Sequence, residues 1–219
     1  MQILVVAATT FEIAAFLEAK PEADHLITGV GAPMAIYHLT KRLQQIDYDL
    51  VIQAGIAGSF KESLKPDKLV FVKQDCFADL GVNEKHEFST IFDMGFADKN
   101  DFPFNKGWLK NTSATMDLFP LPKEKGVTVN TITDNEKQTA QLISTYHPHI
   151  ETMEGAALHY VCLQENVPFL QLRAISNKVG ERDKSKWKLK EAITKLNDGL
   201  IKIVNHLSGG EPTSNKIVN

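Results

Sequence analysis

The chain alternates short apolar segments with amphipathic helical segments, and this alternation restricts the fold more than any other feature. The segment 2–8 is almost wholly apolar and rich in β-branched side chains, which is typical of a strand buried on both faces. The order strand then helix recurs along the chain. Repeated βα units favour a sheet that contains parallel strands and is covered by helices. The sequence therefore predicts an α/β protein.

Hydrophobic periodicity and helix-start signals give approximate bounds for most elements. Thr9 to Glu12 and Thr133 to Glu136 match the capping-box pattern that opens a helix, and we expect Gly55 to Gly58 to form a turn. Strands are predicted at 2–8, 26–28, 50–54, 126–130, 150–153 and 168–175, and further helices at about 32–45, 133–145, 154–164 and 187–203. Residues 76–122 give no clear pattern, and we expect long surface loops there.

Composition excludes several classes of protein. The 219 residues carry 24 basic and 27 acidic side chains without a basic block, so we expect no nucleic-acid partner. Cys76 and Cys162 lie outside any CxxC or Cys/His cluster, which predicts neither a disulfide framework nor a metal site. We see no signal sequence and no run near the roughly 20 apolar residues of a membrane span. A cytoplasmic protein is expected, with one domain over 1–207 and a disordered polar tail over 208–219.

Ligands of an open α/β sheet gather at the carboxyl ends of its strands. Five segments follow predicted strands there: Glu12, Gly29–Gly31, Gly55–Gly58, Met153–Glu154 and Arg173–Asn177. Each has an ordinary structural explanation by itself. Glu12 would complete a capping box, Glu154 would favour a helix N-terminus, and the glycines would form turns.

Two of these segments together carry a resemblance. Met153-Glu154-Gly-Ala-Ala and Arg173-Ala-Ile-Ser-Asn177 resemble the paired signatures of the nucleoside phosphorylase and nucleosidase superfamily, and the resemblance extends over residues 1–207. Within the superfamily the chain is most similar to the futalosine hydrolases, which are relatives of the methylthioadenosine/S-adenosylhomocysteine nucleosidases. The implied fold is a single-domain three-layer sandwich with a central mixed β-sheet flanked by helices.

The resemblance also implies roles. Glu12 would activate water, Arg173 would help to position it, Glu154 would bind the ribose and Asn177 the base. Further substrate contacts are implied at Met153, Ile56, Gly58, Ile132 and Ser176. No metal and no organic cofactor are implied. The implied partners are a small purine nucleoside and other copies of this chain, in a homodimer or larger homo-oligomer. In it, residues 88–104 of one copy would complete part of the substrate pocket of its neighbour.

Two departures from the adenine-releasing nucleosidases bear on the substrate. Asn177 stands where those enzymes have an aspartic acid that protonates the purine N7, and Ile56 stands where they tend to have serine. The Asn177 carboxamide offers an acceptor to a protonated N7 and a donor to a 6-oxo group, a combination that suits hypoxanthine and not adenine. The loss of a polar group at Ile56 argues mildly against a phosphate site, which needs several donors.

We therefore expect hydrolysis of the N-ribosyl bond of futalosine, with release of hypoxanthine and dehypoxanthinyl futalosine, a reaction of menaquinone biosynthesis. Two alternatives stay open. One is a nucleosidase or phosphorylase acting on methylthioadenosine, S-adenosylhomocysteine or inosine. The other is an inactive nucleoside-binding protein on the same scaffold, which the presence of Glu12 and Glu154 disfavours.

Overall fold

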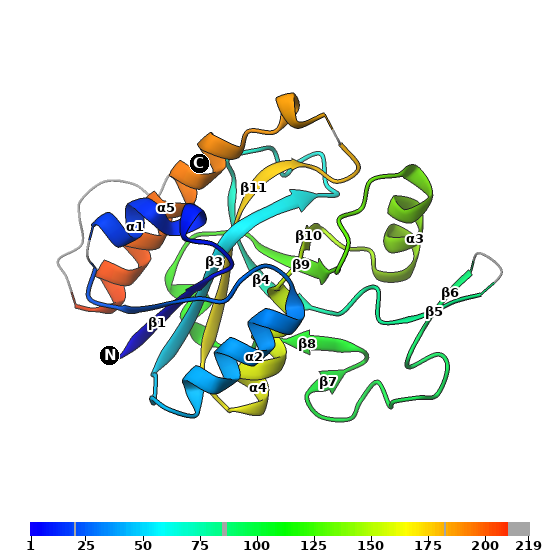
Figure 1. Cartoon of the computed structure of the whole chain (residues 1–219), viewed down its shortest axis with the longest axis horizontal. Helices are drawn as coiled ribbons and strands as arrows, with labels where there is room; N and C mark the ends of the chain where they lie inside the picture. The colour runs from blue at the N-terminus through cyan, green and yellow to red at the C-terminus, as the bar shows by residue number, and fades with distance from the viewer. Residues whose placement is uncertain (20, 85–86, 182, 210–219) are drawn as a thin grey trace.

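The computed structural model describes residues 1–209, apart from 20, 85–86 and 182 (Figure 1). Most of the predicted tail, residues 210–219, lies outside the described residues. The helices are α1 (Ala14–Glu18), α2 (Ala32–Leu43), α3 (Glu136–Tyr146), α4 (Gly155–Gln164) and α5 (Leu189–Leu207), with 3₁₀ turns at Thr10–Ile13, Ala114–Leu118 and Lys184–Lys186. None of the helices in these residues combines the length and apolar character needed to span a bilayer.

Among the described residues, nine strands form one mixed sheet, as predicted, and two more form a separate hairpin. The sheet comprises β1 (Ile3–Ala7), β2 (Asp24–Ile27), β3 (Leu50–Ser59), β4 (Leu69–Asp75), β7 (Phe104–Asn105), β8 (Trp108–Lys110), β9 (Lys123–Thr128), β10 (Ile150–Thr152) and β11 (Phe169–Lys178). The hairpin pairs β5 (Gly81–Glu84) with β6 (Glu87–Thr90). Within the sheet, the pairings β3–β11–β4–β9–β10–β3 close into a ring, which sequence periodicity did not indicate.

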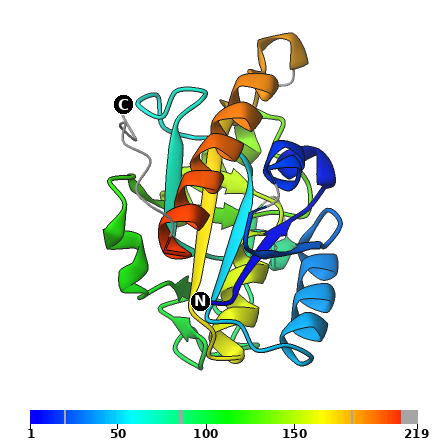
Figure 2. The same cartoon turned by 90° about the vertical axis from the view of Figure 1, so that its left-hand side faces the viewer.

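Two strands, β1 and β10, pair with different parts of the same edge of β3. β11 runs parallel to β3 along nearly its whole length (Figure 2). On the opposite edge, β1 pairs with β3 only as far as Gln53, and β10 pairs with it only at Gly58 and Ser59. The edge of β3 between them, residues 54–57, therefore stays free of any strand partner among the described residues.

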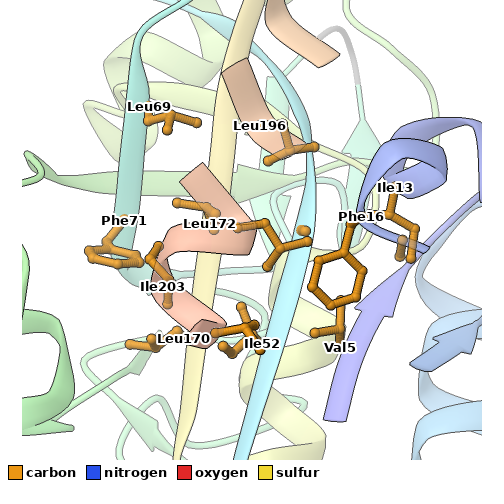
Figure 3. Close-up of a cluster of buried hydrophobic side chains, with 14 of the residues drawn as sticks. Val5, Ile13, Phe16, Ile52, Leu69, Phe71, Leu170, Leu172, Leu196 and Ile203 are labelled. Carbon is orange, nitrogen blue, oxygen red and sulfur yellow. The ribbon is translucent and has the colours of Figure 1, made fainter. Parts of the chain in front are cut away.

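Two apolar cores lie on the two faces of the sheet, as expected for a three-layer arrangement. Along β1, Ile3 and Val5 enter the core shared with α1 and α5, whereas Leu4 and Val6 enter the core shared with α2 and α4. This alternation explains why the whole segment is apolar. Figure 3 shows the first core, where the ring of Phe16 packs among side chains of β1, β3 and α5.

The structure corrects three sequence predictions. Gly55–Gly58 is not a turn, because β3 continues through it to Ser59. Thr133 does not cap a helix; Asn135 caps α3, and its side chain accepts a hydrogen bond from the Gln138 N–H at 2.9 Å. Residues 76–122 are not only loops, since they contain β5 to β8 and a 3₁₀ turn. The strands there are two to four residues long, too short to give a periodic signal.

Candidate active site

A cavity of about 300 Å³ opens beside the unpaired edge of β3. Every residue that the sequence predicted for the site lines it except Arg173. These residues are Glu12, Ile56, Gly58, Ile132, Met153, Glu154, Ser176 and Asn177. The strand-end rule therefore brought together positions that are up to 165 residues apart in the chain (177 − 12). The roles assigned to them remain predictions.

Glu12 completes the predicted capping box and also lines the cavity. Its Oε2 accepts hydrogen bonds from the backbone N–H and the hydroxyl of Thr9, both at 3.1 Å, which completes the predicted capping box. Its Oε1 accepts one from the Ile56 N–H at 3.3 Å, on the free edge of β3. Capping thus fixes the carboxylate at the cavity wall rather than competing with a role there.

Glu154 is held by the glycine turn after β2. The Gly31 N–H donates to its Oε1 at 2.7 Å, and Gly31 has a φ of 98°, which a residue with a side chain adopts only with strain. Burial raises the pKa of Glu154, while the positive charge of Arg173 and the Gly31 N–H oppose the rise. The carboxylate is therefore preorganised at the N-terminal end of α4, where it faces the cavity.

Arg173 lies behind the cavity wall and is 2% exposed. A Cβ on Gly55 would lie 2.0 Å from its Nη1, so this glycine is needed for the close approach of the guanidinium and not for a turn. The guanidinium donates to Gln53, and the Gln53 amide in turn donates to the backbone carbonyl of Glu154 at 3.3 Å. Burial lowers the pKa of Arg173, while Glu154, Glu12 and Asp75 raise it. Sequence reasoning missed Gln53, which reads as an ordinary interior position of a strand.

The end of β11 carries Asn177 on a distorted piece of strand. The β3–β11 register shifts between Ile175 and Asn177, so Ser176 is an extra residue in the ladder. Such bulges redirect side chains near functional sites. The Ser176 hydroxyl donates to the Asn177 Oδ1 at 2.7 Å, and the Asn177 Nδ2 donates to the Lys178 carbonyl at 2.9 Å. These bonds set which way the carboxamide faces.

Two further groups of cavity residues escaped the sequence analysis. One is an apolar wall of Phe11, Val30, Trp187, Leu189 and Ile193. Trp187 was predicted as part of the last helix, but α5 begins at Leu189 and the Trp187 indole lines the cavity instead.

The second group is Glu151, a third carboxylate in the cavity besides Glu12 and Glu154. Thr133 donates to both of its oxygens, through the backbone N–H to Oε1 at 3.1 Å and through the hydroxyl to Oε2. The alternation of side chains along a strand could have identified Glu151, because it faces the opposite way from the buried residue Ile150.

A fully buried carboxylate, Asp75, supports the floor of the site. It accepts hydrogen bonds from the Cys76 N–H, the Thr128 hydroxyl and the Gln171 amide at 2.8, 3.0 and 3.2 Å. The Thr128 Oγ1 also accepts the Ala156 N–H at 2.7 Å, which ties this network to the first turn of α4 beside Glu154. Burial raises the pKa of Asp75 to about 6, against an ordinary value of 3.8.

Comparisons with known proteins agree with this fold. The family model described as the phosphorylase superfamily matches residues 25–207. A futalosine hydrolase of Streptomyces coelicolor is 31% identical over 196 residues, which cover 86% of this chain and 81% of that protein. One from Thermus thermophilus is 27% identical, with 88% and 91% covered.

Among solved structures, the methylthioadenosine/S-adenosylhomocysteine nucleosidase of Helicobacter pylori, crystallised with butyl-thio-DADMe-Immucillin-A, superposes with a TM-score of 0.80. It is 18% identical, and 94% of this chain and 99% of that chain are covered. At this identity the likeness concerns the fold.

Asp75→Asn is expected to remove a pH dependence of stability. Because the folded-state pKa of about 6 lies above the ordinary value of 3.8, the folded protein binds this proton more tightly than the unfolded chain does. The contribution of Asp75 to the free energy of unfolding is therefore fully present below about pH 4 and is lost as the pH rises through about 6, by on the order of 3 kcal/mol.

Urea unfolding from about pH 4 to pH 8 measures this effect. Asp198→Asn, which changes an exposed carboxylate on α5, is the matched control and should follow the unmodified protein. A pH dependence of Asp75→Asn that parallels the unmodified protein would contradict the prediction.

Proposed function

Because the chain belongs to the phosphorylase superfamily, we propose that it hydrolyses the N-ribosyl bond of futalosine, releasing hypoxanthine and dehypoxanthinyl futalosine. The observation that carries the proposal is the convergence of Glu12, Glu154 and Asn177 on one cavity. These groups supply what the reaction needs: a base for water, an anion for the sugar and an amide for the departing purine. Similarity to futalosine hydrolases over most of the chain supports this substrate.

The sugar is assigned to Glu154 and Met153. Departure of the base gives the ribose the character of an oxocarbenium ion, and a preorganised carboxylate stabilises that charge. The Gly31 N–H donates to Oε1 of Glu154 and fixes the orientation of the carboxylate, so Oε2 can accept hydrogen bonds from ribose hydroxyls. Glu154 is 8% exposed, so the attraction of its carboxylate to the developing cation is little screened by solvent.

Water activation is assigned to Glu12. The carboxylate takes a proton from water while the water oxygen forms a bond to the ribose C1′, and the C1′–N9 bond breaks with its electron pair leaving on the purine. Thr9 and Ile56 hold the carboxylate still, which lowers the reorganisation required during the step. Arg173, directly behind Gly55, supplies a buried positive charge that lowers the pKa of Glu154 against the effect of burial.

Asn177 is assigned to the base. Its carboxamide has a donor for a 6-oxo group and an acceptor for a protonated N7, and the bond from Ser176 favours one orientation. Sites built on such hydrogen bonds discriminate against an analogue that lacks the matching group by roughly 10⁴-fold or more. This pairing supports a 6-oxopurine rather than adenine.

Water is favoured over phosphate as the second reactant. Three carboxylates line the cavity, and among its described lining residues there is no lysine, arginine or histidine. An attacking phosphate would meet negative charge and, at Ile56, an apolar side chain. This arrangement supports hydrolysis.

We also propose that the protein forms a homo-oligomer in the cytoplasm. Residues 88–104 expose Met94, Phe96 and Phe102 at 42%, 70% and 69%, and the cavity is bordered by Phe11 at 62% exposure. Large apolar side chains that are exposed to this extent favour contact with another protein. Further copies of the chain are the partner that we propose for them.

The direct experiment is base release from a panel of nucleosides. Futalosine, inosine and methylthioadenosine are incubated with the protein, with and without phosphate, and the free bases are identified by chromatography. We expect hypoxanthine from futalosine at a rate that does not depend on phosphate. Release of adenine from methylthioadenosine with futalosine untouched would establish the alternative substrate, and no release from any nucleoside would favour the inactive binding protein.

Glu12→Gln is expected to reduce kcat on futalosine by roughly 10²- to 10⁴-fold, because it removes the general base. Glutamine also satisfies a capping box, so the fold and the affinity for hypoxanthine should change little. Initial rates and calorimetric titration with hypoxanthine measure the two effects. Glu18→Gln, at an exposed position of α1, is the control for both. Unchanged turnover in Glu12→Gln would mean that Glu12 only caps the helix.

Asn177→Asp is expected to weaken the preference for a 6-oxopurine by at least tenfold. A carboxylate cannot donate to the 6-oxo group, and when protonated it can donate to N7 as in adenine-releasing enzymes. The measurement is the ratio of kcat/KM for futalosine to that for its 6-amino analogue. The exposed Asn205→Asp on α5 should leave this ratio as it is in the unmodified protein. An unaltered ratio in Asn177→Asp would count against the role of Asn177.

A further inference from the structure

Glu151 and Asn177 flank the same glycine on neighbouring strands. In the ladder, Glu151 of β10 lies opposite Gly58 of β3, and Gly58 lies opposite Asn177 of β11. Residues in such a row project from the same face of a sheet, and the outer two are separated by two inter-strand spacings, roughly 10 Å. All three line the cavity. We call the part of the cavity between the carboxylate and the carboxamide the slot, and Gly58, which has no side chain, is one of the residues that line it.

The environment of Glu151 is built to keep a carboxylate in a fixed orientation. The residue is 6% exposed, and Thr133 donates one hydrogen bond to each carboxylate oxygen. Burial raises the pKa of Glu151, whereas the two Thr133 donors lower it. Each oxygen of an ionised carboxylate can accept more than one hydrogen bond. Since both of its oxygens accept from Thr133, Glu151 presents acceptors toward the slot.

The two common types of purine differ at N1 as well as at C6. A 6-oxopurine carries a proton on N1 and donates there, whereas a 6-aminopurine has an unprotonated N1 that accepts. N7 and N1 lie on either side of C6, so a base in the slot that offers N7 and its 6-substituent to Asn177 turns N1 toward the opposite wall. That wall carries Glu151.

We propose that Glu151 accepts a hydrogen bond from the N1–H of a 6-oxopurine and is, with Asn177, a second determinant of base specificity. The inference rests on the proposed function, because it takes the base to occupy this slot. With a 6-aminopurine, the buried carboxylate would face the N1 acceptor with no donor between them, and this loss lets Glu151 discriminate between the two types of base. Glu151 thus rejects adenine by a mechanism that does not involve Asn177.

Thr133 links this contact to the rest of the base site. The residue before it, Ile132, lines the cavity and is 40% exposed, and Glu151 holds the backbone immediately after it through the Thr133 N–H. One carboxylate therefore binds the base edge and also fixes the loop whose apolar side chain faces the base. This accounts for the use of Thr133 as a donor to Glu151 where the sequence pattern predicts a helix cap.

The test uses two free bases that differ only at N1, hypoxanthine and 1-methylhypoxanthine. Their dissociation constants are measured by calorimetry for the unmodified protein, Glu151→Gln and Glu151→Ala. Glu124→Gln is the matched control, because Glu124 is a carboxylate of similar burial, 7% exposed, that pairs with His149 and Lys61 outside the cavity. Thermal unfolding of every variant verifies that it folds.

In the unmodified protein and in Glu124→Gln, we expect hypoxanthine to bind roughly 10- to 100-fold more tightly than 1-methylhypoxanthine, the factor that corresponds to a hydrogen bond with a charged group. Glu151→Gln, which keeps the size of the side chain, should lose most of the affinity for hypoxanthine and little for the methylated base. Glu151→Ala also removes the obstacle to the methyl group, so the ratio should fall close to one.

An unchanged ratio in both Glu151 variants would overturn the inference, because Glu151 would then not face N1. Futalosine hydrolysis, measured in parallel, separates this outcome from failure of the proposed function. If futalosine is cleaved and the ratio is unchanged, only the role of Glu151 fails. If the ratio changes as expected while futalosine is not cleaved, Glu151 reads the base and the proposed nucleoside substrate is wrong.

Discussion

The unpaired edge of β3 is the constraint on which the site depends. A strand edge must satisfy its backbone donors, and here β1 satisfies the first part and β10 the last. Between these two parts, the Ile56 N–H donates to the Glu12 carboxylate and not to a neighbouring strand. The gap between two short strand partners thus creates the cavity and also places an acid in it. The ring of strands through β11, β4 and β9 holds both sides of the gap.

Buried charge beneath the cavity is the second element of the design. Arg173 and Asp75 are both fully buried, and each is costly unless it is paired or hydrogen-bonded. Gln53 joins Arg173 to the backbone of Glu154, and Thr128 joins Asp75 to the start of α4. These hydrogen bonds offset the cost of burying the two charged groups and give the Glu154 carboxylate a rigid support. The acids that face the cavity therefore keep their geometry without a ligand.

Glycines allow these side chains to approach the backbone closely. A Cβ at Gly155 would lie 2.2 Å from both the Asp75 carboxylate and the Gln171 amide, and one at Gly55 would overlap Arg173. Gly58 lies between Glu151 and Asn177 in the ladder and lines the cavity with them. Sequence reasoning explained the glycines of β3 by turns, since a turn is their commonest role. Their role here depends on what lies across from them, which a linear pattern does not contain.

The sequence alone determined the α/β class, most of the longer strands and helices, and the positions that converge at the strand ends, because apolar periodicity and helix caps are local signals. It also singled out Glu12, Glu154 and Asn177. It did not predict β4, which spans Leu69–Asp75. Only the tertiary structure decided that β3 runs through its glycines, that Thr133 binds Glu151 rather than capping α3, and that Gln53 and Asp75 support the acids. Those features are set by contacts between segments that are distant in the sequence. Such contacts leave the local hydrophobic pattern of either segment unchanged, so the pattern does not reveal them.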